Sequence, residues 1–267
     1  MKKGWLKYLT FCFLSLITIT NVEATNDYGN GLYTITNYDV NIKVNENNTF
    51  YITENIKTFF HVPRHGIIKT LPLENKLVRL DGTKSYNRAK ITKIKTNVKN
   101  KIFNEKGNKV IKMGDANETL EGYQNYTISY LYNIGKDPCK NYDEFYFDII
   151  GNGWDTTIDN ITFTIEMPKE FDKTKIGFSS GKTGSTDSSN VTYQVMGNKI
   201  IGSFNKKLNI KEALTIRVEL QEGYFVGAKT NFNFITLLSL ILPLMFTIIT
   251  FILWIKFGKD NKPIETV

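Results

Sequence analysis

Four carboxylate residues lie close to a tryptophan in the middle of the chain: Asp143, Glu144, Asp148 and Asp155 flank Trp154. Paired carboxyl groups beside an aromatic ring can act on glycans, because one donates a proton while the other attacks or stabilises charge. The same residues also suit a structural role, since Asp143 and Asp155 can cap turns and Trp154 can fill a corner of the core. The structural interpretation is favoured, and Asp143, Glu144, Trp154 and Asp155 are kept as candidate ligand-binding residues.

The two histidines of the chain, His61 and His65, are four residues apart. On a helix this spacing would present both imidazoles to one metal ion. Pro63 lies between them and Gly66 follows, and both residues break helices, so the spacing does not predict a metal site. We expect a structured loop instead, with His65 as a further candidate ligand-binding residue. Its basic side chains are His61, Arg64, His65 and Lys69.

Other catalytic arrangements are incomplete in this sequence. The histidines have no serine or cysteine nucleophile near them, so no nucleophile–base pair is evident. Cys139 lies in a lysine-rich segment that could activate a thiol, but an incidental cysteine is the commoner case. Gly151 and Gly153 lack the third glycine and the following helix of a phosphate-binding loop. We therefore predict no catalytic residue, no metal and no cofactor.

The two ends of the chain determine where these residues must function. Residues 234–255 contain no charged side chain, and 22 residues of helix span about 33 Å, enough to cross a bilayer. Lys256, Lys259 and Lys262 follow this segment, whereas Lys229 alone lies just before it. The positive-inside rule therefore predicts a single-pass helix with a short cytoplasmic tail, residues 256–267.

Residues 1–24 have the pattern of a secretory signal peptide. Lys2, Lys3 and Lys7 precede a short apolar stretch, and small or modest residues at Val22 and Ala24 suit a cleavage site. An uncleaved N-terminal anchor is the alternative. After cleavage Cys139 would be the one remaining cysteine, so an exported domain would have no internal disulfide, which favours a bacterial envelope protein. Export also disfavours nucleic-acid binding.

Residues 25–230 alternate between apolar and polar side chains, the period of half-buried strands. Clear cases are residues 38–44, 126–132, 161–167 and 214–220. About nine strands and no amphipathic helix predict an all-β, β-sandwich-like extracytoplasmic domain, followed by the transmembrane helix at 234–255. Glu54 falls in the apolar phase of its strand. Such a carboxylate must be paired, hydrogen-bonded or at a sheet edge, and the edge position is favoured.

The pattern resembles the YciQ-like proteins, a bacterial family of predicted membrane proteins of unknown function. The residues that carry the resemblance are Tyr38-Asp39-Val40, Thr53-Glu54-Asn55-Ile56, His65-Gly66-Ile67, Leu71-Pro72, Gly114-Asp115, Leu120, Gly122, Asp143-Glu144, Ile150-Gly151-Asn152, Trp154-Asp155, Gly223-Tyr224-Phe225, Trp254, Gly258, Asp260 and Pro263. They extend over about residues 30–265. The chain departs from the family pattern at Lys69, Phe147 and Lys259.

The resemblance implies an architecture rather than an activity: a signal peptide, an exported β-rich domain and a membrane anchor. Family members usually continue with a cytoplasmic segment and further membrane helices, so this chain is expected to be a short paralogue or a truncated sequence. The formal net charge is +8, and residues 84–112 concentrate much of it, so wall polymer or lipid headgroups are candidate partners.

The favoured function is a binding module in the cell membrane whose partners are the lipid bilayer and an envelope protein or wall polymer. The alternative is an envelope enzyme acting on glycan through the carboxylates near Trp154.

Overall fold

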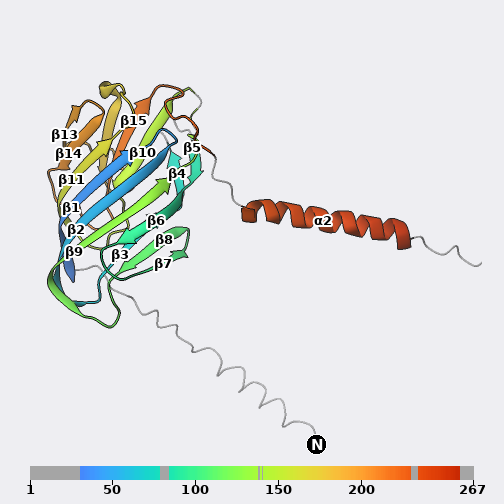
Figure 1. Cartoon of the computed structure of the whole chain (residues 1–267), viewed down its shortest axis with the longest axis horizontal. Helices are drawn as coiled ribbons and strands as arrows, with labels where there is room; N and C mark the ends of the chain where they lie inside the picture. The colour runs from blue at the N-terminus through green and yellow to red at the C-terminus, as the bar shows by residue number, and fades with distance from the viewer. Residues whose placement is uncertain (1–30, 79–83, 138, 140, 230–233, 259–267) are drawn as a thin grey trace, which may run out of the picture.

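The computed structural model describes residues 31–78, 84–137, 139, 141–229 and 234–258. The predicted signal peptide, residues 1–24, and the part of the predicted tail after residue 258 lie outside the described residues. A seven-stranded sheet covers one face of the β domain and an apolar helix follows the domain (Figure 1).

The large sheet has the strand order β13-β14-β11-β1-β2-β9-β6. Its members are β1 (Tyr33–Val44), β2 (Thr49–Arg64), β6 (Lys90–Thr96), β9 (Leu120–Asn133), β11 (Ile158–Glu166), β13 (Val191–Met196) and β14 (Lys199–Phe204). Neighbouring strands are antiparallel except β1 and β11, which are parallel. The turn between β1 and β2 uses Asn48 at φ 57°, a conformation that asparagine tolerates.

Three smaller sheets complete the β domain. One has the order β10-β15-β12 and comprises β10 (Asp143–Ile150), β12 (Ile176–Gly181) and β15 (Ala213–Leu220). The second has the order β3-β8-β7 and comprises β3 (Ile67–Pro72), β7 (Asn100–Glu105) and β8 (Asn108–Met113). The third is the hairpin of β4 (Glu74–Val78) and β5 (Lys84–Arg88). A 3-10 helix, η1 (Lys173–Lys175), precedes β12.

The inner face of the large sheet packs against the two three-stranded sheets. Phe50 of β2 contacts Phe145 of β10 with ring centroids 5.0 Å apart, and Phe163 of β11 contacts Phe178 of β12 at 5.6 Å. Glu54 of β2 pairs with a side chain of β3, described below. These contacts place the hydrophobic core between the layers of a β-sandwich.

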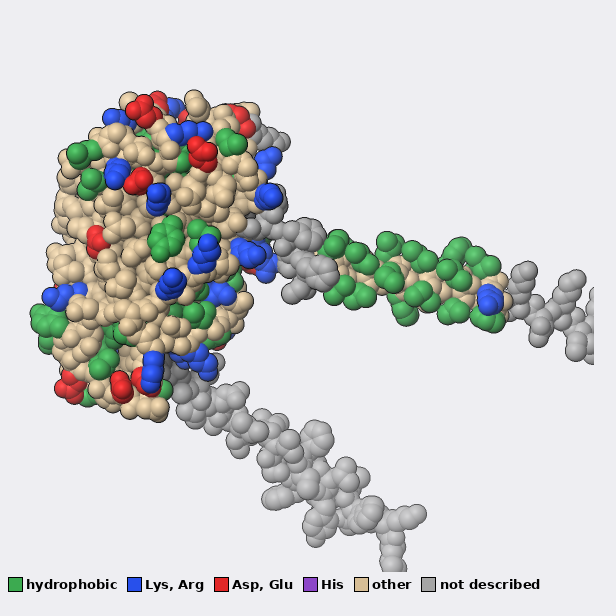
Figure 2. Space-filling model, in the orientation of Figure 1, with side chains coloured by type: hydrophobic (Ala, Val, Ile, Leu, Met, Phe, Trp, Pro, Cys, Tyr) green, Lys and Arg blue, Asp and Glu red, His purple; other side chains and the backbone are tan. Residues whose placement is uncertain are grey.

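Strand periodicity separates the two faces of the large sheet. On β1, Tyr38, Val40 and Ile42 are at most 2% exposed, whereas Asn37 before them and Asn41 between them are exposed. Figure 2 looks onto the outer face, which is mostly tan, the colour of backbone and uncharged polar side chains, with scattered charges and small green areas. The alternation thus yields an apolar inner face and a polar outer face.

The helix α2 (Phe234–Phe257) follows the β domain. Its stretch Leu237–Phe257 has a mean hydropathy of 2.5 and none of it is buried within the protein, so it is long and apolar enough to cross a membrane. Pro243 lies inside the helix, and the hydroxyl of Thr247 donates a hydrogen bond to its carbonyl at 2.8 Å. Bonding of a threonine hydroxyl to the carbonyl four residues earlier is a common local pattern within helices.

The predicted all-β domain followed by one apolar helix is confirmed. The described residues contain fifteen strands rather than about nine. The lysine-rich segment 74–113 alone forms five of them, β4 to β8, and strands of only five to seven residues give little alternation to detect. Residues 61–64 do not form the predicted loop: β2 continues to Arg64 across an irregularity in its pairing with β9.

The predicted edge position of Glu54 is wrong. β2 lies between β1 and β9, and Glu54 is 1% exposed. Its carboxylate is tolerated there because Lys69 from the facing sheet pairs with it. A partner on another sheet leaves no trace in the alternation of a single strand.

Candidate functional site

Trp154 and Asp155 follow β10 at a corner of the core. Trp154 is 3% exposed, and its ring meets that of Tyr38 edge to face with centroids 5.7 Å apart. Asp155 forms an ion pair with Lys211, and 45% of its side chain is exposed. Trp154 is therefore a core residue, as the structural interpretation predicts, whereas Asp155 lies at the surface beside Lys211.

Asp143 and Glu144 lie at the other end of β10. Asp143 Oδ2 accepts a hydrogen bond of 2.8 Å from the backbone N–H of Phe225. Glu144 Oε1 accepts one of 2.5 Å from Nε of Arg217, and both carboxylates are buried. The eight residues of β10 span roughly 23 Å between these acids and the corner that bears Trp154. The glycan-enzyme hypothesis requires these carboxylates to converge on the tryptophan, and Asp143 and Glu144 do not.

His65 lies at the junction of β2 and β3. Its Nδ1 is 2.8 Å from the carbonyl oxygen of Glu118. No hydrogen bond or ring contact within the described part of the chain joins His65 to the other four candidates. The structure thus brings Trp154 close to Tyr38 but distributes the five candidate residues over three separate places. Among the described residues there is also no group of three or more metal-ligating side chains.

The structure assembles a buried polar cluster that the sequence did not predict. The Lys69 ammonium lies 2.7 Å from Glu54 Oε2 and donates a hydrogen bond of 2.7 Å to the Tyr38 hydroxyl. Tyr38 donates to Glu54 Oε2, and Tyr130 donates to Glu54 Oε1 at 2.6 Å. The ammonium also lies 5.4 Å from the Trp154 ring centroid, within range of a cation–π interaction.

This core cluster (Tyr38, Glu54, Lys69, Tyr130 and Trp154) links the large sheet to the sheet β3-β8-β7 and to the corner after β10. Burial, followed by the adjacent Glu54 carboxylate, raises the pKa of Tyr38 and of Tyr130 well above the usual value for a tyrosine. Both hydroxyls therefore stay protonated and serve as donors to the carboxylate. Every named group has a partner and all five side chains are at most 5% exposed, so the cluster has the character of a structural device.

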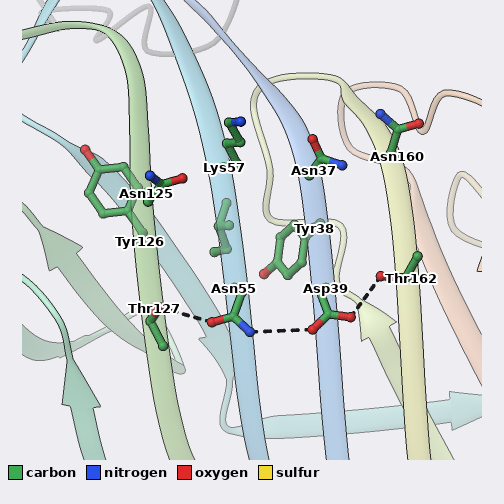
Figure 3. A pocket seen from close by; sticks show the side chains of 11 residues that line it. Asn37, Tyr38, Asp39, Asn55, Lys57, Asn125, Tyr126, Thr127, Asn160 and Thr162 are labelled. Atoms are coloured by element: carbon green, nitrogen blue, oxygen red, sulfur yellow. Dashed lines mark hydrogen bonds between the residues drawn. The ribbon is translucent and has the colours of Figure 1, made fainter.

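On the other side of the same strands, a shallow groove of about 310 Å³ crosses the outer face of the large sheet (Figure 3). Four neighbouring strands, β9, β2, β1 and β11, supply its side chains. Those directed outwards are Asn37, Asp39, Asn55, Lys57, Asn125, Thr127, Asn160 and Thr162. We call this set the polar groove.

A chain of hydrogen bonds orders one row of the polar groove. Thr127 Oγ1 donates to Asn55 Oδ1 at 3.0 Å, and Asn55 Nδ2 donates to Asp39 Oδ2 at 3.5 Å. Thr162 Oγ1 donates to Asp39 Oδ1 at 2.8 Å (Figure 3). Asp39 also accepts a bond of 2.7 Å from Asn41. The row is thus held in one arrangement across four strands, which lowers the entropic cost of binding a ligand there.

The adjacent row of the polar groove presents amides with free capacity. Strand pairing aligns Asn160, Asn37, Lys57 and Asn125. No hydrogen bond from the side chains of Asn37 and Asn125 occurs within the described residues, and both are exposed. Asn160 uses its amide nitrogen on the Thr36 carbonyl at 2.9 Å and keeps its oxygen for another donor. Each free amide offers both donors and an acceptor to a ligand.

The sequence contained a partial signal for this site. The polar phase of β1 supplies Asn37, Asp39 and Asn41, and the corresponding phase of β9 supplies Asn125 and Thr127. Alternation alone does not show that β9 and β11 lie on either side of the β1–β2 hairpin. The lateral order of the strands makes the groove, and that order depends on tertiary packing.

A two-layer β domain with an ordered polar groove and one exposed apolar helix defines a class of membrane-associated β-domain proteins. A family model described as "Predicted membrane protein (DUF2207) N-terminal domain" matches residues 34–201. The chain belongs to this family, and the predicted resemblance to a family of membrane proteins is confirmed. No curated protein matches the chain.

Remote likenesses exist among solved structures. Leukotriene A4 hydrolase from Saccharomyces cerevisiae is 10% identical with a TM-score of 0.37, over 70% of this chain and 29% of that one. The M1 zinc metallopeptidase from Deinococcus radiodurans is 10% identical with a TM-score of 0.34, over 70% of this chain and 43% of that one. The matches span less than half of these proteins, and we draw no inference from likenesses this remote.

Proposed function

We propose that this protein is a binding module of the cell envelope. The helix α2 anchors it in the membrane, the β domain lies on the extracytoplasmic side, and the polar groove binds an envelope component. Membership of a predicted membrane protein family and the apolar character of α2 support the anchor. The lysines after the helix and the signal-like residues 1–24 support the orientation.

The observation that carries the binding role is the combination of order and unused capacity in the polar groove. Asp39 and Asn55 are held by hydrogen bonds across the sheet, while Asn37 and Asn125 beside them are exposed and make no side-chain hydrogen bond within the described residues. Cross-strand hydrogen bonds stabilise the sheet, and in this row they also hold polar groups in fixed positions beside the free amides. Ligand sites typically combine a preformed concave surface with a few fixed polar groups.

The path of the chain limits how far the β1–β2 turn can lie from the start of α2. The backbone N–H of Val226 donates a hydrogen bond of 2.7 Å to the carbonyl of Glu46 in the β1–β2 turn. The eight residue steps from Val226 to Phe234 span at most about 28 Å. This short connection supports a placement in which the β1–β2 turn faces the membrane and the strands carry the groove away from the bilayer surface.

Site-specific photocrosslinking of the full chain in intact cells tests the proposal. A benzophenone-bearing amino acid replaces Asn125 in the groove or, as a matched control, Lys101, an exposed residue of β7 on a different sheet. We expect irradiation to give an adduct of higher mass from position 125 and none from position 101. If positions 37, 125 and 160 all give no adduct beyond the control, the groove does not bind an envelope component.

A further inference from the structure

We propose that the ligand of the polar groove is an uncharged glycan chain, and that Tyr123 provides the ring on which one sugar stacks. This inference rests on the proposed binding function and adds the chemical class of the ligand. It is carried by an exposed aromatic cluster that adjoins the groove, and by the balance of charge within the groove itself.

Three rings form an aromatic shelf on the outer face of the large sheet. Tyr123 of β9 is 62% exposed and is the strand partner of Phe59 in β2, with ring centroids 4.9 Å apart. Phe59 in turn contacts His61, with centroids 5.0 Å apart. The hydroxyl of Thr34 lies 3.0 Å from His61 Nε2 and fixes the imidazole. We call Phe59, His61 and Tyr123 the aromatic shelf.

The aromatic shelf and the polar groove form one continuous surface. Tyr123 and Asn125 are two residues apart on the same face of β9, about 7 Å along the strand. Lys57 lines the groove, and its ammonium lies 4.9 Å from the centroid of the Tyr123 ring. The row formed by Asn160, Asn37, Lys57 and Asn125 thus ends beside a ring that remains mostly accessible. An exposed aromatic cluster of this kind on a soluble domain commonly marks a binding site.

The chemistry of this surface matches a sugar chain. A pyranose ring has one face of C–H groups, which packs on an aromatic ring, and a rim of hydroxyls that both donate and accept. The amides of Asn37, Asn125 and Asn160 and the carboxylate of Asp39 offer the complementary donors and acceptors along one face of the sheet. Stacking on the shelf and hydrogen bonding in the groove would therefore engage successive sugar units.

Charge and backbone pairing distinguish this ligand from the alternatives. One carboxylate, Asp39, and one ammonium, Lys57, line the groove, so their charges balance and an anionic polymer gains no net attraction. A peptide that bound by strand addition would need an unpaired sheet edge. The groove lies over β9, β2, β1 and β11, each of which is paired on both sides. An uncharged, hydroxyl-rich chain is the ligand that remains.

Binding measurements on the full chain in lipid nanodiscs test this assignment. The probes are the β-1,4-linked hexamers of N-acetylglucosamine and of glucose, with heparin as the anionic comparison. We expect at least one uncharged hexamer to bind, and Tyr123→Ala to weaken it about tenfold, the loss of one aromatic contact of about 1.4 kcal/mol. Tyr123→Phe keeps the ring and should bind like the unaltered protein. Tyr51→Ala is the matched control. Tyr51 is 45% exposed on the same outer face of the large sheet, but it lies near the start of β2, whereas Tyr123 pairs with β2 near its other end.

Binding of heparin alone, or an equal effect of Tyr51→Ala and Tyr123→Ala, overturns the glycan assignment. So does the absence of binding to both uncharged hexamers. The crosslinked adduct at position 125 separates this failure from failure of the proposed function. After exhaustive proteolysis, mass spectrometry should find sugar residues on the peptide that contains position 125. A peptide from another protein in their place would overturn the glycan ligand while leaving the binding function standing.

Discussion

The carboxylate of Glu54 and the ammonium of Lys69 lie 2.7 Å apart inside the core, with side-chain exposures of 2% and 5%. They belong to different sheets, so the pair fixes how the sheet β3-β8-β7 sits on the large sheet. A buried ion pair often adds little net stability, because both charges lose their hydration. Its specific effect is to penalise any packing in which one of the two charges faces the core alone.

Removing one member of this pair should therefore lower the free energy of unfolding by more than the intact pair raises it. We expect Lys69→Met to lower the free energy of unfolding by about 3–5 kcal/mol, because Glu54 is left charged and buried without a cation. Glu54→Gln should have a similar effect through Lys69. The double variant should lose less than the sum, since neither charge remains. Chemical unfolding followed by near-UV circular dichroism measures these differences in the full chain.

An exposed pair provides the control for that measurement. Lys175 and Glu219 lie 2.9 Å apart on the surface, with side-chain exposures of 50% and 32%. Lys175→Met should lower the free energy of unfolding by less than about 1 kcal/mol. Equal costs at Lys69 and Lys175, or a double variant that loses the full sum, would contradict the account of a coupled buried pair.

Tyr126 illustrates the opposite case, a buried hydroxyl without a partner. Its side chain is 2% exposed, and its hydroxyl finds no hydrogen-bonding group among the described residues. Tyr126→Phe removes this unpaired group, so we expect the stability at neutral pH to be unchanged or up to about 1 kcal/mol higher. Tyr130→Phe is the matched control. It loses a hydrogen bond of 2.6 Å to Glu54 and should cost about 1.5–3 kcal/mol.

Tyr126→Phe should also change how the stability of the protein responds to alkaline pH. Burial raises the pKa of Tyr126 to about 12, against a smaller opposing effect of Arg64. The unfolded chain releases this proton near pH 10, whereas the folded protein keeps it until about pH 12. The stability that comes from this difference in pKa is therefore fully present below pH 10 and is lost as pH rises towards 12. Between pH 10 and pH 12 the free energy of unfolding of Tyr126→Phe should fall less steeply with pH than that of the unaltered protein. The difference between the two slopes should correspond to about one proton. Identical slopes in urea titrations at several pH values would contradict this.

Local alternation predicted most of the large sheet. The apolar phases of β1, β9 and β11 are the buried faces of those strands, and the same holds for β15 of the facing sheet. The parallel pairing of β1 with β11 was not predicted, because the two strands are more than one hundred residues apart and periodicity contains no information about neighbours. Glu54 was recognised as anomalous within its strand, but its partner Lys69 comes from another sheet.

The residues that carried the family resemblance gain a physical meaning in the structure. Tyr38 and Glu54 of the β1–β2 hairpin meet Trp154, which lies about one hundred residues further along the chain, in the core cluster. Asp143 receives the backbone N–H of Phe225 and so ties the end of the domain to β10. Of these residues, Asp143 and Trp154 also belonged to the glycan-site hypothesis, beside which the sequence favoured a structural role for both. Their partners show that they hold sheets together, which sequence spacing could not distinguish.

Gly66 and Gly114 are far apart in the sequence but lie next to each other in the structure. Their φ angles are 136° and 140°, a region that favours glycine, and a Cβ on either would collide with backbone of the opposite strand at Met113 or His65. We expect Gly66→Ala and Gly114→Ala each to lower the free energy of unfolding by about 3 kcal/mol or more, because strain and collision combine. Gly151→Ala is the control, since Gly151 has no positive φ and open space around it, and should stay within about 0.5 kcal/mol. Thermal unfolding that ranked Gly151→Ala with the other two would contradict this account.

The orientation in the membrane is testable by cysteine labelling in intact cells. In a background in which Cys12 and Cys139 are replaced by serine, Lys101→Cys places a thiol on exposed β7 and Lys262→Cys places one after α2. Because lysines follow α2 closely, we expect a membrane-impermeant maleimide to label position 101 in intact cells and position 262 only after permeabilisation. Detergent-solubilised protein, labelled at both positions, controls for thiol reactivity. The reverse pattern would place the polar groove in the cytoplasm, and the groove could then not meet an extracytoplasmic glycan whatever its affinity for sugars in vitro.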